Sequence, residues 1–356
     1  MITISLCMIV KNEELSLDNA LSSIAHIVDE IIIVDTGSTD ATKKVAASYT
    51  DKIYDFPWCD DFSKARNYAF SKASCEYCMW LDADDILKKE DQEKLLNLKK
   101  TLDSNTSVVM LRYHTAFDDE GNPTFTYYRE RIMRRSDNFK WQGFIHEVIT
   151  PRGKIVYSDI AITHNKMKPA DPKRNLRIFE KKKAEGVTFS PREIFYYARE
   201  LYYTGNYKKA IPVFKKYLKC KDGWKENYIS ACQFKAYCLF QLKKIDEAIQ
   251  SLLESLYYDN PRAEICCDLG AYFYDQKKFE QAIYWYTVAT TCCRDDTNGG
   301  FIYIDCYDYI PYIQLCVCYY FLQDYQKANH YNELAGKCKP NDESYLYNKK
   351  ILAPFL

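Results

Sequence analysis

Three carboxylates follow one apolar segment of the chain within four positions. Residues 77–81 are apolar or weakly polar, and Asp82, Asp84 and Asp85 come directly after them. Carboxylates crowded together repel one another unless a cation lies among them, and hard divalent cations prefer oxygen ligands. The spacing therefore predicts a metal site that holds a phosphorylated ligand. The alternative interpretation is a solvated acidic turn in which Asp84 or Asp85 caps the next helix.

Strands and helices alternate along the part of the chain that leads to this acidic cluster. Apolar runs predict strands over residues 2–10, 31–34, 53–56 and 77–81, and helical spacing predicts helices over 15–27, 41–49 and 62–72. Such β-α-β alternation predicts an α/β domain with a parallel, helix-covered sheet whose strand ends share one edge. In an open sheet this edge faces the ligand crevice.

Polar groups stand at that edge after several of the predicted strands. They are Lys11–Glu13, Asp35–Thr36, the Arg66–Asn67 pair and the acidic cluster. The Asp35 carboxylate could accept the imide hydrogen of a uracil or bind a ribose hydroxyl, and Arg66 could offset phosphate charge. Each also has an ordinary explanation, because Asp35 could cap the following turn and Arg66 could be a surface salt-bridge partner. Their joint occurrence favours a nucleotide site.

Composition limits the classes of function. The chain has 356 residues, with 49 lysines and arginines against 49 aspartates and glutamates, so no global positive field favours nucleic acid. No segment approaches the roughly 20 apolar residues of a membrane-spanning helix. The N-terminus lacks a basic segment and a cleavage site, which predicts a first strand rather than a signal peptide. With 15 cysteines read as reduced thiols, we predict a soluble, cytoplasmic protein.

The second half of the chain changes to helices only from Pro191 onwards. Four pairs of small residues recur 12 positions apart: Ala198 and Ala210, Ala236 and Ala248, Gly270 and Ala282, and Cys316 and Ala328. Ala248 and Ala282 are 34 residues apart, which is the tetratricopeptide period. We therefore predict three segments, namely an α/β domain over residues 1–165, a basic linking helix within 166–190, and an all-α repeat domain over 191–356.

The motifs of the first half resemble the family 2 glycosyltransferases. The resemblance is carried by residues 5–14, 28–40, 62–67 and 81–85, in that order. It implies the GT-A fold, with a mostly parallel sheet, a nucleotide-sugar donor and inversion at the anomeric centre. One departure is Thr36, which stands where many members of the family carry an acidic residue.

The resemblance also implies roles for individual residues. Asp35 would contact the uridine, Asp84 would bind a divalent Mn²⁺ or Mg²⁺ directly, and Asp82 would reach the ribose or the metal through water. His164, at the end of a last predicted strand, would complete the coordination of the metal. The residues expected to bind the UDP-sugar are Val10, Asn12, Glu13, Asp35, Arg66, Asp82, Ala83 and Asp84.

A base for the acceptor is expected in a segment that joins aromatic residues, a glycine and a His-Glu pair. Inverting transfer needs a carboxylate within hydrogen-bond reach of the nucleophile. The form Gly143-x-Ile145-His146-Glu147 resembles the acceptor-side motif of one branch of the family. We predict Glu147 as the base and His146 as a group that steers donor or acceptor, with Asp85 as the second candidate for the base. The alternative is that Glu147 only pairs with one of the arginines at positions 131, 134 and 135.

The joining of such a domain to tetratricopeptide repeats resembles bacterial enzymes that glycosylate peptides or proteins, including bacteriocin S-glycosyltransferases and flagellin glycosyltransferases. The resemblance implies transfer from a UDP-sugar to a polypeptide held by the repeats. Two other hypotheses stay open: transfer to a surface glycan or lipid-linked intermediate, and a repeat scaffold with a vestigial nucleotide site. The sugar, the acceptor atom and a homodimeric state are left open, and no nucleic acid partner is expected.

Overall fold

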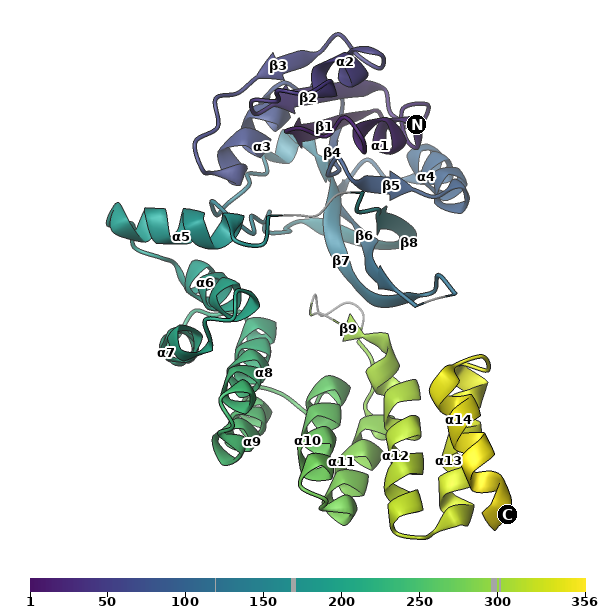
Figure 1. Cartoon of the computed structure of the whole chain (residues 1–356). Coiled ribbons are helices and arrows are strands. Elements are labelled where there is room, and N and C mark those ends of the chain that lie inside the picture. Colours follow the sequence, from purple (N-terminus) through teal and green to yellow (C-terminus); the bar gives the residue numbers. More distant parts are fainter. Residues whose placement is uncertain (119, 168–170, 296–299, 301) are drawn as a thin grey trace. The chain divides into compact units, whose positions relative to one another are not determined.

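The chain folds into two compact units, Met1–Ile178 and Phe179–Leu356 (Figure 1). The computed structural model describes residues 1–118, 120–167, 171–295, 300 and 302–356. None of the helices in these ranges combines the length and the apolar content that a membrane-spanning helix needs.

The first half of unit 1 is the predicted alternation of strands and helices. The strands are β1 (Ile4–Val10), β2 (Glu30–Asp35), β3 (Ile53–Asp55) and β4 (Tyr77–Trp80), and the helices are α1 (Leu17–Ser22), α2 (Thr42–Ala47) and α3 (Phe62–Ser71). The four strands are parallel in the order β3-β2-β1-β4. Their carboxyl ends therefore share one edge, as predicted.

Helices cover both faces of these parallel strands. On one face Leu6 and Met8 of β1 belong to the same buried cluster as Leu21 of α1. On the other face Cys7 belongs to a cluster with Ala69 of α3. Residues that alternate along a strand point to opposite faces, so β1 is apolar at every position that packs under a helix.

The rest of unit 1 adds antiparallel pairings and makes the sheet mixed. Its elements are β5 (Asp85–Leu87), α4 (Lys89–Thr101), β6 (Thr106–Phe117), β7 (Pro123–Arg134), a 3₁₀ turn (Arg135–Asp137) and β8 (Lys154–His164). The strand order continues β4-β7-β6-β8-β5, in which only the β6–β8 pair is parallel. The turn between β6 and β7 contains Asp119, which lies outside the described residues.

The short strand β5 decides between the two interpretations of the acidic cluster. Helix α4 begins at Lys89, with Lys88 as its N-cap, so neither Asp84 nor Asp85 caps it and that interpretation is wrong. Asp85 instead starts β5 and is the register partner of His164 at the end of β8. The strand pairing thus brings a histidine 79 positions further along the chain beside the acidic cluster.

Glu30 at the start of β2 ties three segments together and gives a test of the fold. Burial alone would raise the pKa of Glu30, but hydrogen bonds from Lys52, Ser5 and Ser74 lower that pKa to about 2. Because the pKa in the folded protein lies below the ordinary value of 4.5, the ionised group stabilises the fold above about pH 4.5, and this stabilisation is lost as the pH falls toward 2.

We expect Glu30→Gln to lower the free energy of unfolding by about 2 kcal/mol at pH 7, since charged hydrogen-bonded groups contribute on this order. Denaturant titrations at several pH values measure this difference, which should shrink below about pH 4. Glu90→Gln is the control, because Glu90 is an exposed residue of α4. A difference that is the same at pH 3 and pH 7 would contradict the assignment.

Unit 2 consists of helix pairs that follow one another along the chain (Figure 1). Helix α5 (Arg174–Ala184) spans the boundary between the units. The helices that follow are α6 (Pro191–Tyr203), α7 (Tyr207–Leu218), α8 (Lys225–Gln241), α9 (Ile245–Glu254), α10 (Ala263–Asp275), α11 (Phe279–Thr291), α12 (Tyr309–Phe321), α13 (Tyr325–Cys338) and α14 (Glu343–Leu352). Three 3₁₀ turns (Ser255–Tyr257, Ile304–Tyr307 and Ala353–Phe355) and the two-residue strand β9 (Ile302–Tyr303) complete the unit.

The small residues that predicted the repeats lie where paired helices meet. Ala198 and Ala210 are fully buried in α6 and α7. A Cβ atom at Gly270 of α10 would lie 2.7 Å from the ring of Tyr286 in α11, so only glycine fits there without a shift. The helical repeat architecture is confirmed. The sequence also predicts a loop inserted between two repeats over residues 295–300, and positions 296–299 of it lie outside the described part of the chain.

Candidate active site

The carboxyl ends of β1 and β2 place Asp35 in a buried position with one unused oxygen. Asp35 is the register partner of Val10 and is 1% exposed. Its Oδ1 accepts hydrogen bonds from the backbone N–H groups of Gly37 and Ser38, each at 2.9 Å, so it does cap the following turn. Its Oδ2 is buried and accepts no hydrogen bond within the described residues. Such an atom costs free energy unless a ligand completes it.

The loops after β1 and β2 are held to each other by Asn12 and Glu13. Asn12 has a positive φ of 55°, and its Oδ1 accepts a hydrogen bond from the N–H of Thr39 at 2.8 Å. The N–H of Glu13 donates to Oγ1 of Thr42 at 2.7 Å. Both residues therefore lie at the predicted edge, where their side chains and backbone shape the rim beside Asp35.

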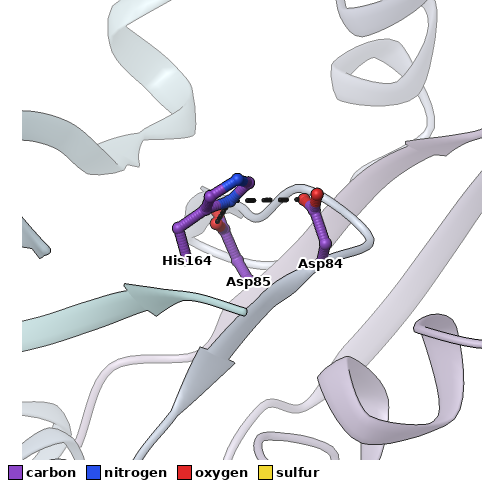
Figure 2. Close-up of side chains that lie close together, drawn as sticks. All are labelled: Asp84, Asp85 and His164. Atoms are coloured by element: carbon purple, nitrogen blue, oxygen red, sulfur yellow. Dashed lines mark ion pairs between the residues drawn. The ribbon is translucent and has the colours of Figure 1, made fainter. Parts of the chain in front are cut away.

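Asp84, Asp85 and His164 form one cluster after β4 (Figure 2). His164 Nδ1 lies 3.6 Å from Oδ1 of Asp84 and 3.5 Å from Oδ1 of Asp85. One ligand atom from each of the three residues lies within 4.8 Å of the others. The structure thus brings the predicted ligands Asp84 and His164 together, with Asp85 as the third member in place of Asp82.

Asp85 is anchored far more firmly than Asp84. Its side chain is fully buried, accepts a hydrogen bond from Arg131 Nη1 at 2.9 Å, and accepts another from the Tyr113 hydroxyl at 2.8 Å. Its Oδ2 also accepts the backbone N–H of Asp82 at 3.1 Å. The Asp84 side chain, by contrast, is 30% exposed. Asp85 therefore fixes the turn, while Asp84 is the carboxylate open to a ligand.

The charges of the cluster favour a cation. Burial raises the pKa of Asp84, and the charges of Asp82 and Asp85 raise it further against the opposing effect of His164. The hydrogen bond to Asp85 raises the pKa of His164, and the charge of Asp84 adds to this. Two carboxylates and an imidazole are donors that Mn²⁺ and Mg²⁺ sites use, so these residues fit a divalent cation.

Arg66 of α3 connects Asp82 with Glu147. Its Nε donates to Oε1 of Glu147 at 2.5 Å, and its Nη2 donates to Oδ1 of Asp82 at 2.6 Å. The guanidinium lies over the rings of Trp80 and Trp141, 4.8 Å from each ring centroid. Arg66 is 6% exposed, so the interpretation as a surface salt-bridge partner is wrong.

The Arg66 guanidinium stays charged, and one of its nitrogens is not used in a hydrogen bond with any described residue. Burial alone would lower the pKa of Arg66, but the charges of Asp82 and Glu147 raise it. Its Nη1 is buried and makes no hydrogen bond within the described residues. An unused cationic donor next to a cluster of carboxylates suits an anionic ligand such as a phosphate.

The segment that carries His146 and Glu147 is a tight loop fastened to α3. Gln142 and Val148 exchange backbone hydrogen bonds of 2.9 and 3.0 Å across it. His146 has a positive φ of 51°, which is strained for a non-glycine residue. Asn67 of α3 holds the loop through hydrogen bonds to both the N–H and the C=O of Trp141, at 2.9 and 3.0 Å. Glu147 is thereby placed against Arg66.

Three residues of the site were not predicted from the sequence as members of it. Trp80 and Trp141 enclose Arg66, and Tyr113 hydrogen-bonds Asp85 and lies 3.2 Å from His164 Nδ1. Trp80 lies directly before the acidic cluster and Trp141 precedes the Glu147 loop, so both tryptophans are close in sequence to predicted site residues. The sequence did not show that Arg66 would be buried between their rings.

Two family models match parts of the chain. Residues 5–155 match the family described as "Glycosyl transferase family 2", and residues 177–255 match "Anaphase-promoting complex, cyclosome, subunit 3". The first unit is a family 2 glycosyltransferase domain with a GT-A-like sheet, and the second unit is an all-helical, tetratricopeptide-like domain.

Two named relatives each match part of the chain. A TPR repeat-containing protein of Synechococcus elongatus is 33% identical over 151 residues, which are 42% of this chain and 36% of that protein. The prophage-derived glycosyltransferase SunS of Bacillus subtilis is 26% identical over 234 residues, which are 60% of this chain and 53% of that protein. The chain thus spans about a third to a half of the length of these relatives.

Among solved structures, the chain is similar to S. aureus TarS 1–349, with 14% identity, a TM-score of 0.35, and coverage of 72% of this chain and 91% of that chain. It is also similar to YrrB, a TPR protein with an unusual peptide-binding site, with 15% identity, a TM-score of 0.38, and coverage of 51% of this chain and 84% of that chain.

Proposed function

We propose that this protein is a metal-dependent inverting glycosyltransferase that moves a sugar from a UDP-sugar to a polypeptide. The observation that carries the proposal is the cluster of Asp84, Asp85 and His164 at the edge where the parallel strands end. The match of residues 5–155 to the family supports the class of reaction. Ligands of open α/β sheets bind outside this edge, so a nucleotide held there would have its diphosphate near the cluster.

Asp35 and Arg66 supply contacts for the donor. The unused Oδ2 of Asp35 would accept the imide hydrogen of the uracil, and Oδ1 stays bound to the turn. The unused Nη1 of Arg66 would donate to a diphosphate oxygen. Asp82, at 37% side-chain exposure and fixed by Arg66, would receive a hydroxyl of the ribose. Val10, Asn12, Glu13 and Ala83 would form the rim of the same site.

Asp84 and His164 would hold the divalent cation, with Asp85 orienting the turn between them. A bound cation there supplies positive charge for a diphosphate as it leaves. His164 keeps its ring in place through its contact with the Tyr113 hydroxyl. The Asp84 side chain is partly exposed, so a cation held there would also be accessible to the phosphates of the donor.

Glu147 would take the proton from the acceptor as the sugar is transferred. Its carboxylate is held by Arg66, which also binds Asp82. One guanidinium would therefore fix the position of the base relative to the donor. Fixing a base in this way lowers the entropic cost of reaching the transition state. His146, one position earlier in the strained loop, would orient donor or acceptor.

The repeat unit favours a polypeptide acceptor over a surface glycan or a lipid-linked intermediate. Stacked helical repeats form extended concave surfaces that bind extended chains. The donor set of Asp84, Asp85 and His164 also argues against a scaffold with a vestigial site. Calorimetric titration with UDP, in Mn²⁺ and in excess chelator, tests the proposal. We expect binding that requires the metal, and binding that is equal in chelator would overturn it.

Replacement of Asp35 by asparagine tests the role of the unused oxygen Oδ2. The amide Oδ1 can still accept from Gly37 and Ser38, and Nδ2 takes the place of Oδ2. A donor then faces the imide donor of uracil, so we expect UDP to bind about 10-fold to 100-fold more weakly, the usual effect of a lost charged hydrogen bond. Calorimetry on the full chain measures this change.

CDP provides the matched ligand for this test, because cytosine N3 accepts a hydrogen bond where uracil N3 donates one. The preference for UDP over CDP should therefore fall in Asp35→Asn. Asp55→Asn is the control variant, since Asp55 is the β3 register partner of Asp35 and its side chain is 75% exposed. An unchanged UDP preference in Asp35→Asn would remove Asp35 from the nucleotide site.

A further inference from the structure

A carboxyl group from one repeat is bound by the side chains of the preceding repeat. Asp268 of α10 accepts a hydrogen bond from the Tyr237 hydroxyl at 2.8 Å and another from Gln233 Nε2 at 2.7 Å. Gln233 and Tyr237 lie one turn apart on α8 and are themselves joined, with Gln233 Nε2 2.7 Å from the Tyr237 oxygen. All three residues are intermediate between buried and exposed.

Aromatic rings surround this carboxyl group. Tyr202 of α6 lies 6.1 Å from Tyr237 and 5.1 Å from Phe234, measured between ring centroids. Tyr272 lies one turn after Asp268 on α10, and burial together with the charge of Asp268 raises the pKa of Tyr272. The Tyr272 hydroxyl is buried and has no hydrogen-bond partner within the described residues. The site is therefore a carboxyl group among tyrosines, one of which, Tyr272, has a hydroxyl left unsatisfied by the described residues.

The carboxyl group lacks a cation. In the described ranges no lysine or arginine forms an ion pair with Asp268, and the nearby ionised side chain that acts on it is another acid, Glu264. Burial raises the pKa of Asp268 to about 7 despite the two hydrogen bonds. Arg199 of α6 is engaged elsewhere, with Nη2 2.7 Å from the Tyr203 oxygen. A buried acid without a cation is destabilised, and a cationic ligand would relieve this.

We propose that Asp268, Tyr237 and Tyr202 bind a lysine or arginine side chain of the polypeptide acceptor. The proposal rests on the proposed function for the polypeptide nature of the partner, and on charge complementarity for its basic residue. The methylene groups of such a side chain pack on aromatic rings while its charged end reaches a carboxylate. A peptide that is extended along the first helices of the repeats would present one side chain in this way.

Fluorescence anisotropy on the full chain tests this site without any sugar donor. The probes are labelled 12-residue peptides of glycine, serine and threonine with one central residue, which is lysine, arginine, methionine or glutamate. We expect the lysine and arginine peptides to bind at least about 10-fold more tightly than the methionine peptide, an effect in the range of a charge-assisted contact. Equal binding of the lysine and methionine peptides, or no binding of any peptide, overturns the proposal.

Asp268→Asn keeps a hydrogen-bond acceptor for Tyr237 and removes the charge. It should bind the lysine and methionine peptides equally, and a retained preference for lysine would overturn the proposal. Asp275→Asn is the matched control, because Asp275 is exposed on the same helix; its preference should be unchanged. Tyr237→Phe is a second variant, which keeps the ring but not the donor to Asp268, and should reduce the lysine preference.

Hydrolysis of the UDP-sugar by the same preparations separates this inference from the proposed function. Asp268 lies in unit 2, outside the glycosyltransferase domain, so Asp268→Asn should hydrolyse the donor at the wild-type rate. A protein that hydrolyses the donor but shows no preference for basic peptides would contradict the site alone. A protein that prefers basic peptides but uses no UDP-sugar would contradict the proposed function alone.

Discussion

Asp84→Asn is expected to lower the metal-dependent release of UDP from a UDP-sugar by about 10³-fold, which corresponds to about 4 kcal/mol of transition-state stabilisation. Asp84 is the accessible carboxylate of the cluster, and its side chain makes a long contact of 3.6 Å to His164. An amide of the same shape leaves this arrangement in place but removes a charged ligand. Steady-state rates measured over a range of Mn²⁺ concentrations should show both the lower rate and a weaker dependence on metal.

A loss of charge on β8, the strand that carries His164, provides the control for Asp84→Asn. Asp159 of β8 has a side chain that is 86% exposed and lies on the strand that ends at His164. Asp159→Asn should turn over donor like the wild type. Unchanged turnover in Asp84→Asn, at an unchanged melting temperature, would show that the cluster holds no catalytic cation.

Much of the fold could be predicted because the parallel strands are short, largely apolar runs. Residues 31–34, for example, are four β-branched residues followed by an aspartate, and the strand ends at that aspartate. The last strands could be predicted less well. Their order depends on non-local pairing, such as β8 between β6 and β5, and the three residues of β5 give no periodic signal. The alternative interpretation of Asp84 or Asp85 as a helix cap failed for this reason.

The candidate site was predictable as a set of residues but not as a set of contacts. The sequence indicated that Asp35, Arg66 and the acidic cluster meet at one edge, because parallel strands end together. It could not show that Arg66 takes Asp82 into an ion pair while Asp85 binds buried Arg131. Both guanidiniums lie over the Trp80 ring, at 4.8 Å and 3.8 Å from its centroid, and a sequence pattern does not reveal such long-range contacts.

Glu147→Gln is expected to reduce sugar transfer by about 10²-fold to 10⁴-fold, the usual contribution of a general base, while UDP-sugar binding is retained. The glutamine Oε1 can still accept the hydrogen bond from Arg66 Nε, so the guanidinium and its contact with Asp82 stay in place. The variant loses the negative charge of the carboxylate and with it the ability to take a proton. Transfer to a peptide acceptor, followed by mass spectrometry, and donor binding, followed by calorimetry, measure the two properties on one preparation.

Burial favours Glu147 over Asp85, the second carboxylate predicted from the sequence as a candidate for the base. The full burial of Asp85 and its bond to Arg131 leave it poorly placed to meet an acceptor, whereas the Glu147 side chain retains 11% exposure. Glu90→Gln, which alters an exposed residue of α4, should transfer sugar at the wild-type rate. Transfer at the wild-type rate in Glu147→Gln would place the base elsewhere, because the glutamine can still accept the hydrogen bond from Arg66 but cannot take a proton.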